Sequence, residues 1–424
     1  MPRPISAPAP DPHALRVWKL IYEHSQLSRT DLVGLTGYSH FLVSRLCDRL
    51  LKDGYISEVG AGDSTGGRRP RILAVTPGFG RIVGLHVGTV NARAVVTDIA
   101  GNVMAFLKAP SLVQSGPDVA LPHLTELISK AIAEAGVQVD EVLGIGVGIS
   151  GISDRSTGTT ISWPKVPSWK NVPVLSVISA QFPVPVKLED TPRAMALAER
   201  RFGGAKDESD FLYLMIGAGV GSALILGGRP YTGKNGFAGE FGHIASDPNG
   251  PVCDCGNRGC VETRVSAWAL VRKAQEAISQ GLRSELWNLS NGDPQTVSVE
   301  LIAQAAESGD RFALRLIEET AVSLGEAMVC LINLLNPELV ILGGGVVSAL
   351  GQRMLDTINR IVRERALPPS VTSLRIELST LQEVHWAMGA SLLVAEDGME
   401  RVFALRENAL SVKRRRRLAG FPAD

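Results

Sequence analysis

The stretch Glu240–Glu262 reads E-F-G-H-I-A-S-D-P-N-G-P-V-C-D-C-G-N-R-G-C-V-E and restricts the fold more than any other part of the chain. One histidine, His243, is followed by three cysteines, Cys253, Cys255 and Cys260. One imidazole and three thiolates are the ligand set of a closed tetrahedral zinc site. The other interpretations are unrelated loop thiols and a disulfide pair. The pattern favours a structural zinc knuckle.

Charge is distributed unevenly along the 424 residues, although the formal net charge is zero. Residues 1–80 carry ten Lys/Arg and seven Asp/Glu, and residues 400–424 carry seven and three. The middle of the chain is therefore acidic. Basic ends around an acidic body indicate a polyanion partner for the ends alone. The length predicts two to three domains.

The first residues, M-P-R-P-I-S-A-P-A-P-D-P, predict a disordered proline-rich arm. They lack the apolar region of a signal peptide. The chain also has no run of about 18 apolar residues, the length that spans a membrane. We therefore expect no membrane partner. Free thiols without an export signal favour the reducing cytoplasm.

The N-terminal part of the chain has the pattern of a helix-turn-helix. Apolar residues recur at helical spacing over His13–Ser25. A short helix is expected between a cap at Ser28 and a stop at Gly37, and a longer one between Ser39 and Gly54. This geometry places the longer helix in the major groove of DNA. The alternative is a small helical protein-interaction module with a charged loop.

The DNA contacts are predicted from the polar start of the longer helix and from the basic segment G-G-R-R-P that follows it, which fits a wing. Side chains at the start of a recognition helix reach base edges, and wing arginines lie near phosphates or in the minor groove. The predicted DNA-binding residues are Ser39, His40, Ser44, Arg45, Arg68 and Arg69.

The remainder of the chain has the texture of two strand-rich lobes with glycine turns. The segment R-I-V-G-L-H-V-G-T-V-N-A-R-A-V-V-T-D, from Arg81, predicts a strand hairpin, and a helix is expected over Pro117–Ala135. The pattern of strand and glycine turn returns in F-L-Y-L-M-I-G-A-G-V-G-S-A-L-I-L and in L-V-I-L-G-G-G. Such a duplication predicts an α/β fold with a cleft between two lobes.

Several motifs together resemble one family. G-H followed by C-x-C-G-x-x-G-C-x-E stands at Gly242–Glu262, S-x-G-G-R-R-P at Ser64–Pro70, and G-V-G-x-x-G-x-x-D at Gly146–Asp154. From about His13 to Glu396 the chain resembles the transcriptional-repressor branch of the ROK family (repressor, open reading frame, kinase). The resemblance implies a winged helix-turn-helix fused to an actin-like (ribonuclease H-like), two-lobed, sugar-kinase-type domain that forms a homodimer or homotetramer.

The predicted boundaries follow from these motifs. In order along the chain, we expect a disordered arm (1–12), the winged helix-turn-helix (13–80), the ROK sugar-binding domain (81–398) and a basic tail (399–424). Lobe one is expected over about 81–190 plus 385–398, and lobe two over about 191–384. The run K-R-R-R-R at Lys413–Arg417 is either solvated or makes nonspecific phosphate contacts.

The resemblance also assigns ligand-binding residues. Asp190, in L-E-D-T-P-R-A, stands where the family's kinases place the base that deprotonates the sugar hydroxyl. Glu240, His243 and Glu262 would hydrogen-bond sugar hydroxyls, and His243 would also hold the zinc. From the residues alone, the alternative for Asp190 is a cap on the Ala-rich helix that follows it.

Two candidate sugar-binding residues, Lys165 and Glu189, stand where many family members have asparagines. They would form an ion pair across the pocket, or each would contact the ligand. A lysine at this place favours an acidic, amino or phosphorylated sugar as the effector. The alternative for Lys165 is a solvated loop residue.

The segment expected to bind phosphate differs more strongly from the family pattern. Family kinases carry D-I-G-G-T-K, whose aspartate and paired glycines organise phosphate and magnesium. This chain has H-V-G-T-V-N at His86–Asn91, so that Thr89 replaces one glycine. A β-branched residue blocks close approach of the backbone to phosphate. We therefore expect no useful catalysis and neither ATP nor Mg²⁺ as a cofactor.

Together these features predict a sugar-responsive, DNA-binding transcriptional regulator, a repressor by its family branch. Its partners would be a double-stranded DNA operator and a sugar or sugar derivative. One alternative is an active ATP-dependent sugar kinase that also binds DNA. Another is a repressor controlled by a protein partner, with a vestigial cleft. Retention of Asp190, Glu240, His243 and Glu262 argues against the second alternative.

Overall fold

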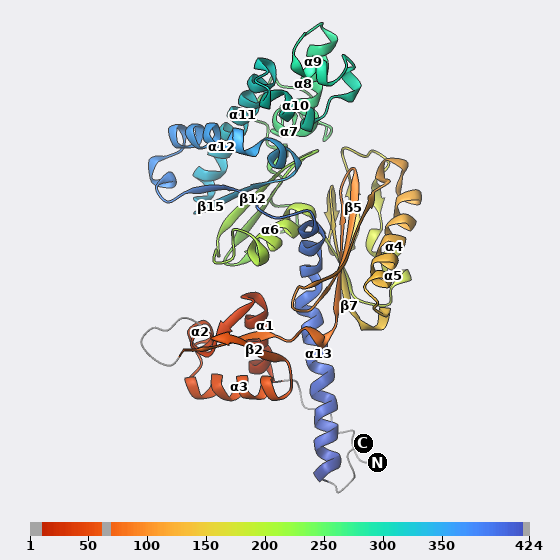
Figure 1. Cartoon of the computed structure of the whole chain (residues 1–424), viewed down its shortest axis with the longest axis vertical. Helices are drawn as coiled ribbons and strands as arrows, with labels where there is room; N and C mark the ends of the chain where they lie inside the picture. Colours follow the sequence, from red (N-terminus) through yellow and green to blue (C-terminus); the bar gives the residue numbers. More distant parts are fainter. Residues whose placement is uncertain (1–10, 62–68, 419–424) are drawn as a thin grey trace.

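The computed structural model describes residues 11–61 and 69–418, with side chains up to residue 407. Figure 1 shows three bodies, the winged helix-turn-helix, the lobe that carries β5 and β7, and the lobe that carries β12 and β15. The long helix α13 runs from the junction of the lobes past the winged helix-turn-helix. Most of the predicted arm, and Arg68 of the predicted wing, lie outside the described residues.

The winged helix-turn-helix has its helices capped as the sequence predicts. Ser28 caps α2 in a capping box, Gly37 ends it with φ 70°, and Ser39 caps α3. A glycine suits the left-handed position after α2 because it has no Cβ to clash. The three strands pair in the order β1-β3-β2. The elements are α1 (Pro12–Glu23), β1 (Gln26–Ser28), α2 (Arg29–Thr36), α3 (His40–Lys52), β2 (Ile56–Ala61) and β3 (Arg71–Val75).

Lobe one is a five-stranded sheet in the order β11-β7-β4-β5-β6. The helices α4 and α5 pack against one face, and α4 begins at the predicted residue. A small antiparallel sheet, β8 to β10, extends from the end of β7. The bounds are β4 (Arg81–Val87), β5 (Asn91–Asp98), β6 (Val103–Pro110), α4 (Pro117–Glu134), β7 (Val142–Ile149), β8 (Ile152–Asp154), β9 (Thr159–Ser162), β10 (Lys170–Val172), α5 (Val174–Gln181) and β11 (Val186–Asp190).

Lobe two repeats this plan with a sheet in the order β14-β13-β12-β15-β16. Its largest core lies between the sheet and helices α7 to α12, and α6 packs against the other face. The bounds are α6 (Thr191–Phe202), β12 (Phe211–Ile216), β13 (Val220–Leu226), β14 (Arg229–Pro230), α7 (Glu262–Val265), α8 (Ala267–Ser279), α9 (Glu285–Leu289), α10 (Val299–Glu307), α11 (Arg311–Leu335), β15 (Leu339–Gly343), α12 (Gly345–Arg365) and β16 (Arg375–Leu378). The chain then leaves lobe two as α13 (Val384–Leu418).

Short 3-10 helices join several of these elements. They are η1 (Pro77–Phe79), η2 (Val113–Ser115), η3 (Val139–Glu141), η4 (Phe241–His243), η5 (Pro294–Thr296) and η6 (Pro368–Val371). Among them, η4 matters for function because it carries His243. Over the described part of the chain, no helix has both the length and the apolar character to cross a bilayer.

Helix α13 packs directly on the sheet of lobe one. A Cβ atom on Gly84 or Gly146 would clash with the backbone of Ala387 or Ala390 in α13. The glycines of these strands therefore allow the helix to approach the sheet closely.

The C-terminal end differs from the predicted basic tail. The sequence placed a separate tail from residue 399, whereas α13 continues to Leu418. Met399, Val402 and Phe403 are buried in the core of the winged helix-turn-helix with Trp18. Their spacing of three and four residues places them on one side of a helix, so the apolar pattern was present in the sequence. The side chains of Lys413–Arg417 lie outside the described residues.

Candidate functional site

The four predicted metal ligands converge in the structure. One ligand atom from each of His243, Cys253, Cys255 and Cys260 lies within 4.8 Å of the others. Nδ1 of His243 is 3.7 Å from Sγ of Cys253, and Sγ of Cys255 is 3.8 Å from Sγ of Cys260. A disulfide needs sulfur atoms about 2.05 Å apart, and the described cysteines are free. The cluster can therefore bind a metal ion.

The local backbone explains why these ligands meet. Two isolated bridges, Ala245 to Cys260 and Val252 to Arg258, close the segment into a compact loop. Gly259 has φ 66°, and a Cβ atom there would collide with the backbone of Asp247. Burial raises the pKa of Cys260 to about 12. A cation is therefore needed to turn this buried thiol into a thiolate ligand.

Two predicted sugar-binding acids flank the metal cluster. Glu240 precedes η4, and burial, partly offset by the nearby His243, raises its pKa. Glu262 is the first residue of α7, and its Oε2 accepts a hydrogen bond from the Val220 amide at 2.8 Å. Gly219 has no side chain to obstruct this carboxylate. The structure thus brings Glu240, His243 and Glu262 together in lobe two.

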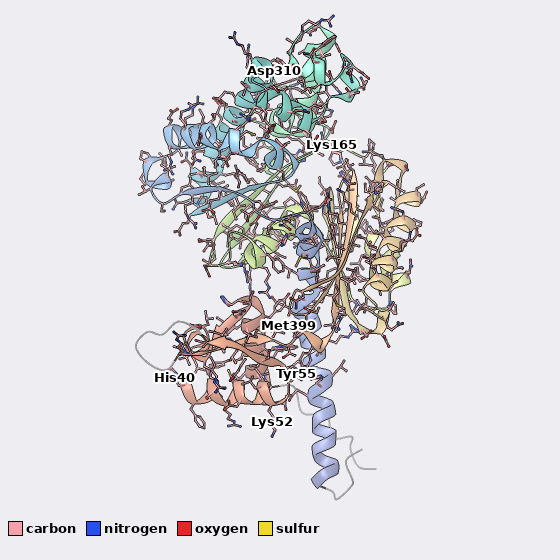
Figure 2. All side chains as sticks on the ribbon, in the orientation of Figure 1. His40, Lys52, Tyr55, Lys165, Asp310 and Met399 are labelled. Carbon is pink, nitrogen blue, oxygen red and sulfur yellow. The ribbon has the colours of Figure 1, made fainter. Side chains whose placement is uncertain are left out.

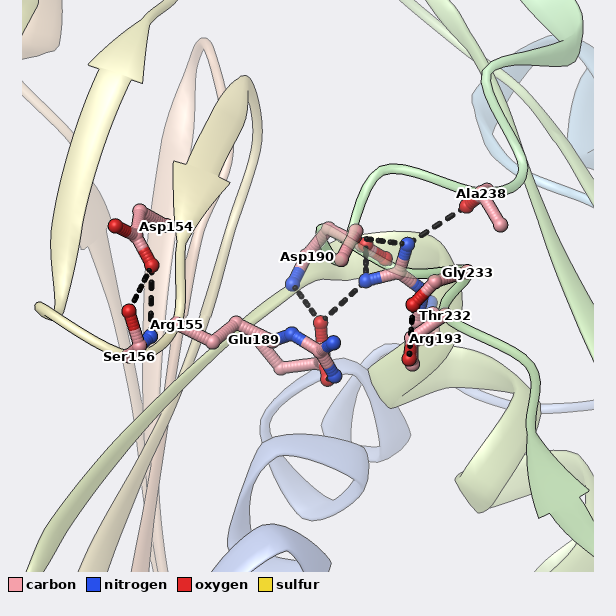
Figure 3. A network of polar contacts seen from close by, with 10 residues as sticks. Asp154, Arg155, Ser156, Glu189, Asp190, Arg193, Thr232, Gly233 and Ala238 are labelled. Atoms are coloured by element: carbon pink, nitrogen blue, oxygen red, sulfur yellow. Dashed lines mark hydrogen bonds and ion pairs between the residues drawn. The ribbon is translucent and has the colours of Figure 1, made fainter.

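The remaining predicted acids, Glu189 and Asp190, end β11 and are engaged by arginines (Figure 3). Nη1 of Arg193 lies 2.9 Å from Oε1 of Glu189 and 2.7 Å from Oδ2 of Asp190. Arg155 pairs with the other oxygen of Glu189 at 2.8 Å. Arg193 also donates to the carbonyl oxygens of Gly236 and Ala238, at 2.8 and 2.7 Å. Arg193 therefore links the lobe-one acids to the loop that leads to Glu240.

Asp190 forms the helix cap that the sequence left open, and its pKa is raised. It caps α6, because its Oδ1 accepts a hydrogen bond from the Arg193 amide at 2.8 Å. Burial, followed by the charge of Glu189, raises the pKa of Asp190 to about 7 against the opposing effect of Arg193. The buried Arg193, only 3 % exposed, was not a predicted site residue. The signal for it was an arginine three residues after Asp190 and four after Glu189, a spacing at which the side chains meet at the start of a helix.

Lys165 does not pair with Glu189, so the predicted ion pair between them is wrong. The lysine reaches from lobe one to lobe two, where Nζ lies 2.7 Å from Oδ2 of Asp254 and 3.2 Å from Oε1 of Glu262. It also lies 4.7 Å from the centre of the Trp268 ring. Figure 2 labels Lys165 between the lobes. Burial would lower the pKa of Lys165, but its two acidic partners more than offset this and raise it. The solvated-loop interpretation is therefore also wrong.

The phosphate side is built around a buried histidine. His86, near the end of β4, lies 4.9 Å from the Trp386 ring, and its Nδ1 is 3.3 Å from Nη1 of Arg93. Burial, followed by the positive charge of Arg93, lowers the pKa of His86 to about 3. The imidazole is therefore neutral, where the family motif has a carboxylate. A cavity of about 180 Å³ nearby is lined by Gly343, Gly344 and Trp386, among others.

The predicted recognition helix, α3, presents a mixed face to solvent. His40 and Arg45 are exposed, whereas Ser44 accepts a hydrogen bond from Nη1 of Arg29 at 2.7 Å. Phe41 is 77 % exposed on the same helix and was not a predicted DNA contact. In the sequence, Phe41 could have been singled out as an aromatic residue that lies outside the row of apolar residues that α3 buries. Arg69 is also exposed. Figure 2 labels His40 and Lys52 at the two ends of this helix.

Comparison with known proteins agrees with this architecture. A sequence profile described as the ROK family matches residues 82–397. The chain belongs to the ROK family. A solved ROK family transcriptional regulator, a homologue of the Escherichia coli Mlc protein, superposes with a TM-score of 0.75 at 26% identity and covers 93% of this chain and 98% of its own. The actin-like fold of the ROK sugar kinases and regulators is thus present.

Curated relatives within the ROK family include both regulators and enzymes. The xylose repressor of Caldicellulosiruptor bescii is 33% identical over 383 residues, which cover 90% of this chain and 95% of the repressor. The glucokinase of Thermotoga maritima is 28% identical over 316 residues, 74% of this chain and 98% of the enzyme. The match to the repressor spans nine-tenths of the chain, so it includes at least part of the N-terminal winged helix-turn-helix.

Proposed function

We propose that this ROK protein is a transcriptional repressor whose hold on a DNA operator responds to a carbohydrate bound between its lobes. The observation that carries the proposal is the combination of an exposed recognition helix, α3, with a cluster of Glu240, His243 and Glu262 in lobe two. The relative named a xylose repressor supports it. Its oligomer would be a homodimer or homotetramer, which places two recognition helices on one palindromic operator.

A neutral sugar fits the site better than an acidic one. The positive charge of Lys165 is already met by Asp254 and Glu262, and Arg155 and Arg193 are met by Glu189 and Asp190. An anionic ligand would enter beside these carboxylates without a free cation among the residues named. Hydroxyl groups both donate and accept, so that they suit carboxylates and an imidazole. We infer a neutral pentose or hexose, with D-xylose as the first candidate.

Zinc would have a structural role in this site. Three thiols and one imidazole complete a tetrahedral set and leave no open position for chemistry. Nδ1 of His243 lies on the side of Cys253, which leaves Nε2 for a sugar hydroxyl. The metal would then hold the imidazole in the orientation that the ligand requires.

The non-catalytic interpretation is supported on the phosphate side and at the base position. His86 is neutral and buried, so it cannot organise magnesium in place of an aspartate. Both oxygens of Asp190 are engaged by Arg193.

A sugar kinase is the second candidate, because the pKa of Asp190 near 7 suits a general base and because a glucokinase is among the relatives. A coupled assay of ATP turnover with a sugar panel tests it. Turnover of about one per second, the lower range of kinases, would favour the enzyme over the repressor alone.

The sugar response is tested by thermal shift with D-xylose, D-glucose, N-acetyl-D-glucosamine, gluconate and glucose 6-phosphate. A neutral sugar at a hundredfold excess over Kd should stabilise the protein by roughly 2.7 kcal/mol. Glu240→Gln should lose most of this effect, and the exposed Glu300→Gln should keep it. Stabilisation by the anionic ligands alone would contradict the neutral-sugar assignment.

DNA binding is tested on a duplex that the protein selects from a random pool. Phe41 would contact a thymine methyl group. Replacing Phe41 by Ala should weaken binding about fourfold, because burial of one methyl-sized group contributes about 0.8 kcal/mol. Replacing the half-site thymines by deoxyuridine should weaken binding of the unmodified protein and leave that of the variant unchanged. Leu334→Ala, a similarly exposed residue in lobe two, is the control.

A further inference from the structure

Helix α6 is the element that touches both the carbohydrate site and the DNA-binding domain. Asp190 caps its first turn and Arg193 lies within that turn, in the network of Figure 3. Its last turn carries Arg201, which faces the winged helix-turn-helix. Twelve helical residues span about 18 Å. One rigid element therefore joins the two ends.

The contacts at the far end of α6 are specific to one place on the DNA-binding domain. The guanidinium of Arg201 lies 4.9 Å from the centre of the Tyr22 ring and donates a hydrogen bond to Oγ of Ser25. It also approaches the carbonyl oxygen of Ala100 in lobe one at 3.4 Å. Ser25 has φ 65°, in the turn that joins α1 to β1. Arg201 thus fixes this turn against the ROK domain.

The same turn leads within a few residues to the recognition helix. Strand β1 begins at Gln26 and ends at Ser28, the cap of α2. The next residue, Arg29, donates a hydrogen bond to Ser44 and pairs with Asp48 of α3 at 2.7 Å. A displacement of Ser25 would therefore reach the exposed face of α3 through contacts that the structure contains.

Helix α6 also makes close contacts with its neighbours along its length. A Cβ atom on Gly389 of α13 would clash with the backbone of Ala194, so the two helices cross in close contact. The buried Glu199 accepts hydrogen bonds from Ser379 and from the Gly204 amide. Any shift at the Asp190 end would thus be carried along the helix and not absorbed within it.

Resting on the proposed carbohydrate response, we infer that α6 transmits ligand binding to the operator-binding surface. Arg193 would follow the ligand because it holds Glu189, Asp190 and the backbone of the loop before Glu240. Arg201 is the coupling residue, since it passes the displacement of α6 to Ser25. Only ligands that favour one position of α6 over the other would shift operator affinity.

The test measures three quantities by calorimetry and fluorescence anisotropy. They are the Kd for the panel sugar that stabilises the protein most, and the Kd for the selected duplex with and without that sugar. In the unmodified protein the sugar should weaken duplex binding by roughly 5- to 150-fold, the usual range of coupling. In Arg201→Ala this ratio should fall to within about twofold of one, with sugar affinity retained.

The exposed Arg229→Ala on β14 is the control and should keep the full ratio. If Arg201→Ala folds poorly, Tyr22→Leu removes the same contact from the other side and should give the same loss. If Arg201→Ala or Tyr22→Leu kept the full ratio of the two duplex Kd values, the inference would be overturned. Arg406→Ala removes a contact of α13 with Phe79, and loss of coupling in that variant alone would assign the transmission to α13 instead. If the unmodified protein shows no sugar effect on the duplex, the proposed function itself fails.

Discussion

The two halves of the interlobe site have opposite characters. The half beside the metal cluster keeps groups that hydrogen-bond hydroxyls, namely Glu240, His243 and Glu262. The half around His86–Asn91 replaces a carboxylate by a neutral buried imidazole, packed on Trp386. The difference teaches that recognition of a ligand and transfer of phosphate are separable within one fold. The regulator proposed above would need only the first.

Loss of the metal should have the largest effect on stability. The metal would hold His243 in place beside Glu240 and Glu262, so its removal would disrupt the sugar half of the site. Cys260→Ser should abolish stoichiometric zinc, since structural zinc sites contribute of order 10 kcal/mol. Metal analysis and thermal melting are the measurements, with the exposed Cys330→Ser as the control. A variant that keeps one zinc per chain would contradict the four-ligand site.

The second largest effect should distinguish the halves directly. Glu262→Gln removes a buried charged acceptor and should weaken sugar binding roughly 5- to 150-fold, since an unsatisfied buried group costs about 1–3 kcal/mol. His86→Gln, in the other half, should leave sugar affinity nearly unchanged. Calorimetry measures both. Equal losses in the two variants would mean that the halves do not act separately.

Lowering the pH should reduce the free energy of unfolding through His86, in the phosphate half of the site. Its pKa of about 3 in the folded protein lies below the ordinary value near 6.5, so the unfolded chain binds the extra proton first. Stability should therefore be lost as the pH falls from about 6.5 towards 3, by up to about 1.4 kcal/mol per pH unit. Urea unfolding should show a weaker pH dependence for His86→Gln. An unchanged pH profile in that variant would show that folding does not lower the pKa of His86.

The smallest effect is expected at Lys165. This lysine reaches from lobe one to lobe two, and its positive charge is already balanced by Asp254 and Glu262. Lys165→Met should change the affinity for a neutral sugar by less than about fivefold, because its pair with the exposed Asp254 contributes about 1 kcal/mol or less and the buried Glu262 keeps its hydrogen bond from the Val220 amide. Calorimetry with D-xylose and gluconate is the measurement. If gluconate binds and Lys165→Met abolishes that binding, the lysine receives an anionic ligand.

Residues close in sequence could be assigned without the structure. The metal ligands lie between His243 and Cys260, and glycine turns bring them together locally. The caps Ser28, Gly37 and Ser39 are likewise signals read within one turn of a helix. The partner of Lys165 could not be assigned in this way, because Asp254 lies 89 residues away. Its ionic environment depends on how the lobes close.

The sequence by itself determined the family, the duplicated α/β lobes, the helix-turn-helix and the four residues of the candidate metal site. In each case, short-range spacing and turn chemistry limit the chain to few conformations. Only the tertiary structure decided that Arg193 binds the carbonyl oxygens of Gly236 and Ala238, that α13 joins the core of the winged helix-turn-helix, and that Arg201 meets Tyr22. These contacts join segments far apart in the chain, so their partners are chosen by packing of the whole molecule and not by local preference.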